Sequence, residues 1–242
     1  MDGWQERTGL LLGAEAQEAL SAAHVLVCGV GGVGAYAAEM LARSGVGRLT
    51  LIDSDRVQPS NINRQLPALH STVGRHKVEI MSERLRDINP LLQLSPRVEY
   101  IEEETVGALL DALQPRPDFI VDAIDTIAPK CALLAEAYRR GIPVISSMGA
   151  GAKSDVTKVQ YGRLGKTFHC TLARAVRQRL KKQSASLLNL PVVFSAEQAD
   201  ERAVIRVTER NKKSTCGTVS FLPAVFGCYL AAFVVRKLAG LK

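Results

Sequence analysis

Paired cysteines are absent from this sequence of 242 residues. Its five cysteines never occur as C-x-x-C and stand at Cys28, Cys131, Cys170, Cys216 and Cys228. Disulfide frameworks use even sets of cysteines, and thiolate zinc sites use closely spaced pairs. We therefore expect neither, and we expect a cytoplasmic chain with reduced thiols. Cys28 and Cys228 lie in apolar runs, so both are predicted to be core residues.

Long uninterrupted apolar runs and a signal segment are also missing. The first residues carry charges where a secretion signal needs apolar side chains. The longest apolar run, residues 221–235, contains Pro223 and Gly227. It is shorter than the roughly 20 residues of a spanning helix, so we predict a buried helix and no stable membrane span.

Charge of neither sign dominates strongly. Lys and Arg number 31 against 24 Asp and Glu, a net charge of +7, which favours a polyanionic partner without naming one. Aromatic residues are 5% of the chain, and no aromatic-rich RNA-recognition motif is present. An apolar content of 47% predicts a folded protein rather than a disordered one.

Strand-like and helix-like segments alternate over the first 150 residues. Short β-branched runs occupy residues 24–30, 47–53, 119–125 and 142–147, and helical spacing occupies 34–43, 74–89, 104–113 and 129–140. An edge strand is expected near Pro96, which would interrupt a central ladder. The alternation predicts an α/β, Rossmann-like, doubly wound and mainly parallel sheet.

The pattern changes after Gly151. A basic helix at 171–182, strands at 192–197 and 202–208, and the apolar helix near 221–238 are expected. We predict one domain, 1–242, in which 1–151 form the Rossmann-like half. Residues 152–242 would form an inserted substrate-binding segment and the C-terminal helix.

GVGGVG at residues 29–34 follows a strand and opens a helix, the setting of a dinucleotide-binding turn. Gly29 would allow the turn, Gly31 and Gly32 would leave room for phosphate, and Gly34 would let the helix approach the strand. Asp53 ends the next strand, where it could accept hydrogen bonds from a ribose. These features alone favour an NAD-dependent oxidoreductase, with a ligand-free tight turn as the plainer alternative.

The run DSDRVQPSNINRQ at 53–65 argues for phosphate chemistry instead. After the ribose-binding position, hydride transfer needs little more from the protein, because the cofactor supplies the chemistry. Cations near a glycine-cradled phosphate would stabilise charge on a triphosphate. The candidate nucleotide-binding residues beyond the glycines and Asp53 are Asp55, Asn61, Arg64, Gln65 and Lys77.

DAID at 122–125 places a carboxylate, Asp125, just past a strand end. Mg²⁺ prefers one or two carboxylates together with phosphate oxygens, so Asp125 is a candidate metal anchor. The competing interpretation is a cap for the following helix, and the sequence favours neither.

These motifs, with GRHKVEIMSERLRDINP at 74–90, resemble the adenylating family that includes ubiquitin-activating enzymes and sulfur-carrier adenylyltransferases. The resemblance implies ATP in the 1–151 half, held by the glycine turn, Asp53, Asn61, Arg64 and Lys77, with Asp125 on Mg²⁺. Arg7 matches an arginine that the family donates across a dimer, which implies a homodimer. The zinc-binding cysteine pairs of some relatives are missing, so no zinc is expected.

Two stretches of the second half, KTFHCTLARAVRQRLKK at 166–182 and VVFSAE at 192–197, resemble a subfamily of tRNA-modifying dehydratases within that family. The resemblance implies ATP-dependent cyclisation of N6-threonylcarbamoyladenosine in tRNA through an acyl-adenylate. A basic cluster would then contact tRNA phosphates, although a solvated helix face is the plain alternative; it comprises Arg174, Arg177, Arg179, Lys181 and Lys182.

Several alternatives stay open. The protein could activate the C-terminus of a small sulfur-carrier protein, or bind a nucleotide without catalysis. Cys216 could accept an acyl group or merely pack. Thr126 stands where many relatives have Asn, and Cys170-Thr171 where some dehydratases have Asp-Pro. A monovalent cation and a cysteine-desulfurase or sulfur-acceptor partner are left open as well.

Overall fold

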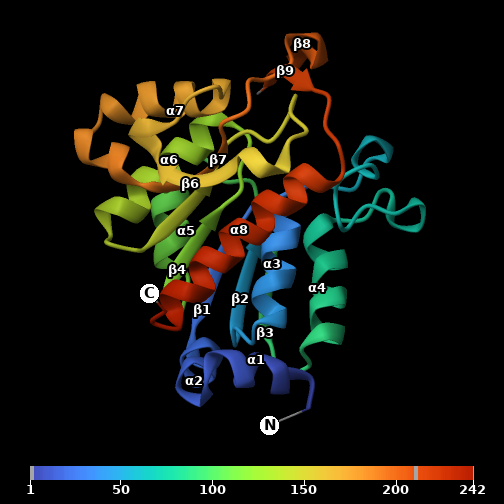
Figure 1. Cartoon of the computed structure of the whole chain (residues 1–242), viewed down its shortest axis with the longest axis vertical. Coiled ribbons are helices and arrows are strands. Elements are labelled where there is room, and N and C mark those ends of the chain that lie inside the picture. The colour runs from blue at the N-terminus through green and yellow to red at the C-terminus, as the bar shows by residue number, and fades with distance from the viewer. Residues whose placement is uncertain (1–2, 210–211, 242) are drawn as a thin grey trace.

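Seven strands form one sheet at the centre of the computed structural model, which describes residues 3–209 and 212–241 (Figure 1). The ends of the predicted domain, residues 1–2 and 242, lie outside the described residues. The strands are β1 His24–Cys28, β2 Arg48–Ile52, β3 Gln93–Arg97, β4 Phe119–Asp122, β5 Val144–Ser147, β6 Val159–Arg163 and β7 Pro191–Ser195. A separate antiparallel pair contains β8 Val204–Glu209 and β9 Lys212–Cys216.

The strand order β3-β2-β1-β4-β5-β7-β6 confirms the predicted Rossmann-like α/β fold. All neighbours pair in parallel except β6, which runs antiparallel to β7. β1 is buried on both faces, as expected for a continuous apolar run in a parallel sheet. β3 lies at the edge, where Pro96 removes no central ladder bond, and this prediction is confirmed.

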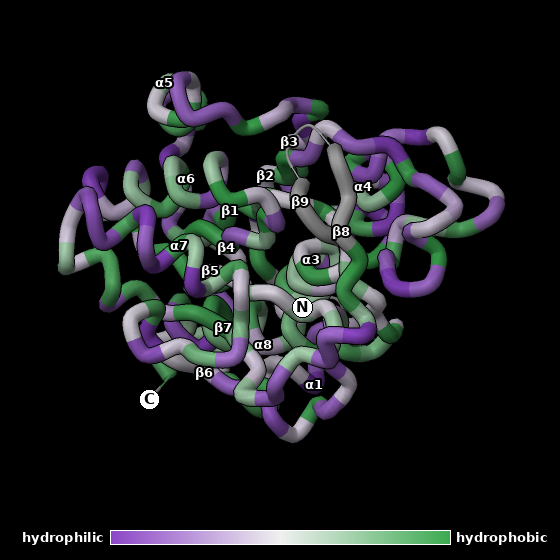
Figure 2. The backbone as a smooth tube through the Cα atoms, turned by 90° about the horizontal axis from the view of Figure 1, so that it is seen from above, coloured by the Kyte–Doolittle hydropathy of each residue, from purple (hydrophilic) through white to green (hydrophobic). Residues whose placement is uncertain are grey.

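Helices cover both faces of the sheet (Figure 2). One apolar core joins the sheet to α3 Gly34–Arg43, α4 Lys77–Ile88 and α8 Phe221–Leu238. A second core joins the opposite face to α5 Val106–Asp111, α6 Ile127–Arg139 and α7 Thr171–Lys181. α1 Glu6–Leu12 and α2 Ala14–Ala22 lie at the edge where the parallel strands begin (Figure 1). Short 3-10 turns occupy Gly3–Gln5, Pro59–Asn61, His70–Thr72, Val156–Lys158, Leu164–Lys166, Ala185–Asn189 and Glu201–Ala203.

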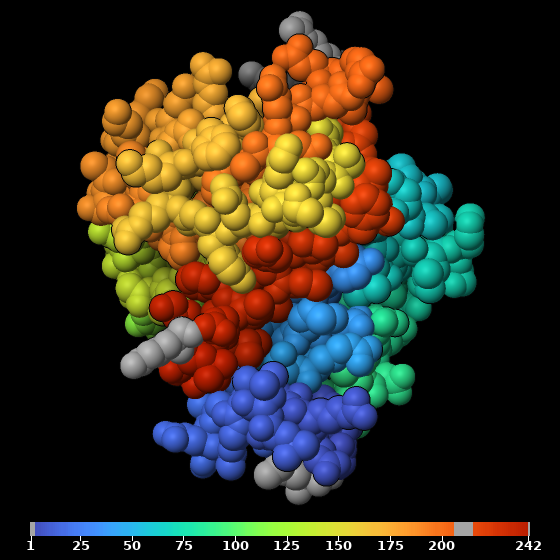
Figure 3. Space-filling view, viewed as in Figure 1, coloured from blue at the N-terminus to red at the C-terminus, as the bar shows by residue number. Residues whose placement is uncertain are grey.

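Helix α8 is the apolar segment predicted to be buried, and it is buried on one side only. Leu222, Phe226, Leu230 and Val234 are fully buried, each contributing roughly 2 kcal/mol of transfer free energy. In the part of the chain that the structure describes, α8 is also the one helix long and apolar enough to cross a membrane, with 39% of it buried. Its outer side lies at the surface (Figure 3), so Cys228 is exposed and its prediction as a core residue was wrong.

The second half of the chain adds β6 and β7 to the main sheet and forms the separate pair of β8 and β9. Of these four strands, β7 and β8 correspond to the runs predicted at 192–197 and 202–208. β6 and β9 were not predicted. β6 lies at the edge of the sheet, and three of its five residues are exposed, so its sequence, VQYGR, contains no long apolar run.

Candidate active site

A glycine turn joins β1 to α3 at the carboxyl edge of the sheet. Gly29 has a φ of +87°, a conformation that favours glycine. A Cβ on Gly34 would lie 1.8 Å from the Gly29 carbonyl oxygen, so only glycine allows α3 to start this close to the strand. Gly31 and Gly32, just before the first turn of this helix, line a cavity, and a helix start supplies amide donors for an anion.

The cavity has a volume of about 700 Å³, within the range of about 300–1,000 Å³ that is usual for small-molecule sites. Its walls include the glycine turn, the segment after β2, the start of α4 and the loop after β4. The carboxyl ends of β1, β2 and β4 are neighbours in the sheet, so parallel pairing brings these three loops together.

Asp53 braces the glycine turn from the end of β2. Its Oδ2 accepts a hydrogen bond from the Val30 amide at 2.6 Å, and its Oδ1 accepts one from the Asp55 amide at 2.8 Å. Burial raises the pKa of the Asp53 carboxyl, while the Lys77 ammonium and these two amides oppose that shift. Asp53 also lines the cavity, and each oxygen keeps a further lone pair for a ribose hydroxyl.

Lys77 brings a buried positive charge to the cavity wall. Helix α4 begins at Lys77, later than the predicted residue 74, because His76 pairs with Arg56 in an extended bridge. Lys77 is only 4% exposed, and its Nζ lies 2.7 Å from Asp55 Oδ2. The Asp55 side chain is 65% exposed, so the buried ammonium is neutralised from the solvent side.

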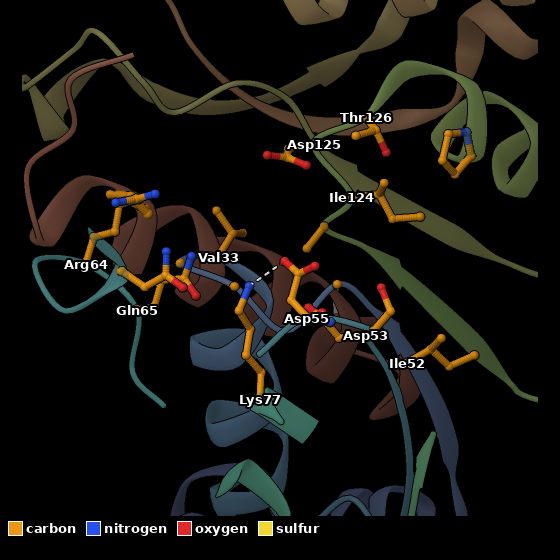
Figure 4. Close-up of a pocket in the computed structure, with 18 of the residues that line it drawn as sticks. Val33, Ile52, Asp53, Asp55, Arg64, Gln65, Lys77, Ile124, Asp125 and Thr126 are labelled. Atoms are coloured by element: carbon orange, nitrogen blue, oxygen red, sulfur yellow. Dashed lines mark hydrogen bonds and ion pairs between the residues drawn. The ribbon is translucent and has the colours of Figure 1, made fainter. Parts of the chain in front are cut away.

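The polar run at 53–65 divides into residues that build the loop and residues that face the cavity. Asn61 Oδ1 accepts a hydrogen bond from the Gln58 amide, and Asn63 donates to the Thr218 carbonyl. Arg64 donates to the Ser60 carbonyl and to Asn63 Oδ1, and its side chain lies beside Gln65 at the cavity (Figure 4). Among the described residues, the Gln65 Oε1 atom is buried with no hydrogen-bond partner, although other atoms of Gln65 line the cavity.

Asp125 faces this cationic wall from the loop after β4 (Figure 4). The N-cap residue of α6 is Thr126, so Asp125 lies one residue before the cap position. Within residues 3–209 and 212–241, no three His, Cys, Asp or Glu side chains group to hold a metal. One carboxylate would nevertheless fit Mg²⁺ bound together with a nucleotide, because Mg²⁺ then takes its other ligands from phosphate and water.

Other predicted site residues lie outside this cavity. Arg7 is on α1, at the opposite edge of the sheet (Figure 1). On α7, Arg177 donates to the Thr167 carbonyl and hydroxyl at 2.6 Å, and Arg179 pairs with Glu103. The exposed members of the basic cluster are Arg174, Lys181 and Lys182. Cys216 is exposed and packs beside Gly151, which lines the cavity.

Sequence reasoning missed the buried pair of Lys130 and Asp122, which lies beneath the loop that carries Asp125. Both side chains are 0% exposed, and Lys130 Nζ lies 2.7 Å from Asp122 Oδ2. A signal was available, because Lys130 is the one charged residue in the otherwise apolar start of α6, IAPKCALLA.

Three features together define a nucleotide-binding α/β protein: a helix start that offers amide donors, an acidic residue at the end of the next strand, and cations that face them. The sequence matches the ThiF family over residues 6–242, and the chain belongs to that family.

Two bacterial relatives are similar to this chain over nearly their whole length. The tRNA threonylcarbamoyladenosine dehydratase of Bacillus subtilis is 40% identical, covering 96% of this chain and 93% of that protein. The Escherichia coli protein of the same name is 36% identical, covering 98% and 95%. The crystal structure of E. coli tRNA N6-threonylcarbamoyladenosine dehydratase, TcdA, in complex with ATP covers 99% of this chain and 96% of that chain, with a TM-score of 0.88 and 34% identity. That protein was also solved with AMP.

Gly34→Ala should lower the free energy of unfolding by about 3 kcal/mol or more, because the new Cβ would meet the Gly29 carbonyl. Urea unfolding measures this change. Gly3→Ala is the matched control, since nothing lies within 4 Å of its Cβ position, and it should stay within about 0.5 kcal/mol of the wild type. Equal stability of the two variants would contradict the close approach of α3 to the turn.

Proposed function

We propose that this protein is an ATP-dependent enzyme that dehydrates N6-threonylcarbamoyladenosine in tRNA. One observation carries the proposal: the similarity to dehydratases of this substrate extends through residues 152–242 as well as the nucleotide-binding half. The cavity supports the use of ATP, because Arg64 and Lys77 line it together with the glycine turn, and cations there suit a triphosphate better than a nicotinamide.

The reaction needs activation of a carboxylate. A carboxylate resists substitution because its leaving group would be an oxide ion. Attack of its oxygen on the α-phosphorus of ATP forms a new P–O bond, breaks the bond to the bridging oxygen and releases pyrophosphate. The acyl-adenylate that results carries AMP, a good leaving group. A nucleophile within the same modification then displaces AMP and closes a ring, with overall loss of water.

The cavity residues supply positioning and charge. Backbone amides of the glycine turn would receive phosphate oxygens, and Arg64 and Lys77 would stabilise the charge that develops on them. Asp125 would hold Mg²⁺, which offsets phosphate charge when bound. Ring closure within one substrate benefits from high effective concentration, so it requires no acyl transfer to Cys216.

Incubation with ATP, Mg²⁺ and tRNA that carries the modification should release pyrophosphate and AMP and give a product one water lighter. Lys77→Ala should slow pyrophosphate release by about 100-fold or more, because a buried phosphate-facing charge is lost. Removing it takes a counter-charge from the exposed Asp55 carboxylate and from the nearby Asp53, which keeps its two amide hydrogen bonds, so the variant should fold, as its melting temperature will report.

A comparison of modified tRNA with a sulfur-carrier protein as substrates decides between the alternative functions. Pyrophosphate release driven by a sulfur-carrier protein and not by tRNA would favour a carrier-activating enzyme. If neither modified tRNA nor a sulfur-carrier protein caused any release of pyrophosphate, adenylation would be contradicted, and a binding protein or an oxidoreductase would be favoured.

A homodimer would complete the site through Arg7. We propose that Arg7 contacts ATP in the neighbouring copy, since α1 lies at the edge of the sheet opposite the cavity. Arg7→Ala and Lys77→Ala should each be inactive alone. After subunit exchange, an equal mixture should recover about one quarter of the wild-type turnover, because half of the dimers carry one complete site. A mixture that stays inactive would contradict donation between subunits.

The basic cluster at α7 would contact the tRNA backbone through its exposed members, Arg174, Lys181 and Lys182, rather than through all five of its cations. Arg174→Glu and Lys181→Glu should each weaken tRNA binding and reduce the slope of log Kd against log salt by about one. Fluorescence titration at several salt concentrations measures this. Arg86→Glu, an exposed charge reversal on α4 across the sheet, is the control; an equal effect there would assign the loss to net charge alone.

A further inference from the structure

A closed network of three buried side chains lies directly beneath the nucleotide cavity. Asp122 ends β4, and its Oδ2 forms an ion pair with Lys130 Nζ at 2.7 Å and accepts a hydrogen bond from Ser146 Oγ at 2.6 Å. All three residues are completely buried. Lys130 comes from the first turn of α6 and Ser146 from β5, so the network joins three elements.

Stability alone gives a poor reason for this network. Transferring two charged groups from water to the protein interior has a large unfavourable desolvation free energy. Apolar residues of similar volume often replace such a pair without loss of stability. A buried pair is therefore better understood through the geometry that it imposes.

The network fixes the position of the Ile124 backbone. Asp122 Oδ1 accepts a hydrogen bond from the Ile124 amide at 3.1 Å, and Lys130 Nζ donates to the Ile124 carbonyl at 2.8 Å. The preceding residue, Ala123, donates from its amide to the Cys28 carbonyl at 2.8 Å. Both peptide groups that flank Ile124 are thus held, and the next residue is Asp125, whose carboxylate lies in the cavity (Figure 4).

Lys130 itself does not reach the cavity. Its side chain is 0% exposed, and its ammonium is engaged by Asp122 and by the Ile124 carbonyl, whereas Lys77 forms part of the cavity wall. Lys130 can influence a bound nucleotide only through the loop that it holds.

We propose that Asp122, Lys130 and Ser146 are positioning residues that hold the loop 123–126 so that the Asp125 carboxylate faces the phosphates of ATP. The inference rests on the proposed role of Asp125 in adenylation. It assigns to the buried network a function in the reaction rate, separate from nucleotide binding by the glycine turn and Lys77.

The test is the double variant Asp122→Asn with Lys130→Met, which removes both charges at once and so leaves no buried ion without a partner. Pyrophosphate release with modified tRNA should fall about 10–100-fold in kcat, the usual effect of losing groups that orient a site residue. The KM for ATP and the affinity for AMP should stay within about threefold of the wild type, because the glycine turn and Lys77 are untouched. Amide hydrogen exchange in residues 123–126 should accelerate by about tenfold or more, whether or not the enzyme turns over.

Thr50→Val is the control for general loss of stability. It breaks another buried polar contact of the same sheet, His24 Nε2 to Thr50 Oγ1 at 2.9 Å, which borders a separate cavity. Thr50→Val should leave kcat and the hydrogen exchange of the loop amides at their wild-type values, even where its melting temperature is as low as that of the double variant.

Ser146→Ala removes one hydrogen bond and no charge, so it tests the proposal if the double variant does not fold. Its kcat should fall several-fold, and its affinity for AMP should be retained.

Wild-type kcat and unchanged loop exchange in the double variant, or in Ser146→Ala, would overturn the proposal. An equal loss of kcat in Thr50→Val would overturn it as well, since the network would then act only through stability. Absence of pyrophosphate release in the wild type would instead refute the proposed function. In that case the exchange of the loop amides alone decides whether the network holds the loop.

Discussion

Buried ammonium groups need a counter-charge or hydrogen-bond acceptors, and this requirement organises the carboxyl half of the sheet. Lys77, Lys130 and Lys153 are all less than 7% exposed. Lys77 meets the Asp55 carboxylate, Lys130 meets Asp122, and Lys153 donates to the Ser195 carbonyl at 2.8 Å. Burial lowers the pKa of Lys153, while the nearby Cys170 and Glu197 oppose the shift. The three lysines therefore differ in how readily an incoming anion could replace their present partner.

Lys77 has the partner that is easiest to replace. Asp55 approaches it from solvent, so a phosphate oxygen could take over the neutralising role without exposing the core. Lys130 has its partners inside the core, and no ligand can reach them. The same side-chain chemistry thus suits ligand binding at one position and suits loop geometry at the other. An oxidoreductase has little use for the first arrangement, since hydride transfer adds no charge to the phosphates.

The sequence predicted what depends on local pattern and missed what depends on distant contacts. The glycine turn and the run at 53–65 were recognisable because their residue types have few other uses at a strand end. Lys130 was missed because its significance comes from Asp122 and Ser146, which join it only in the folded sheet. The edge strand β6 lacked an apolar run, and Arg177 and Arg179 could not be separated from the exposed cations of α7 before their partners Thr167 and Glu103 were known.

Sheet geometry also limits what a single chain can do with Arg7. The cavity lies where β1 ends, and α1 lies at the edge where β1 begins. Five residues of parallel strand separate the two edges by about 16 Å, and the strand is packed between helices on both faces. An arginine side chain is shorter than this separation and cannot pass through the core. Arg7 of one chain therefore cannot serve the nucleotide cavity of the same chain in this fold, and any contact of Arg7 with phosphate requires a second copy whose amino edge faces this cavity.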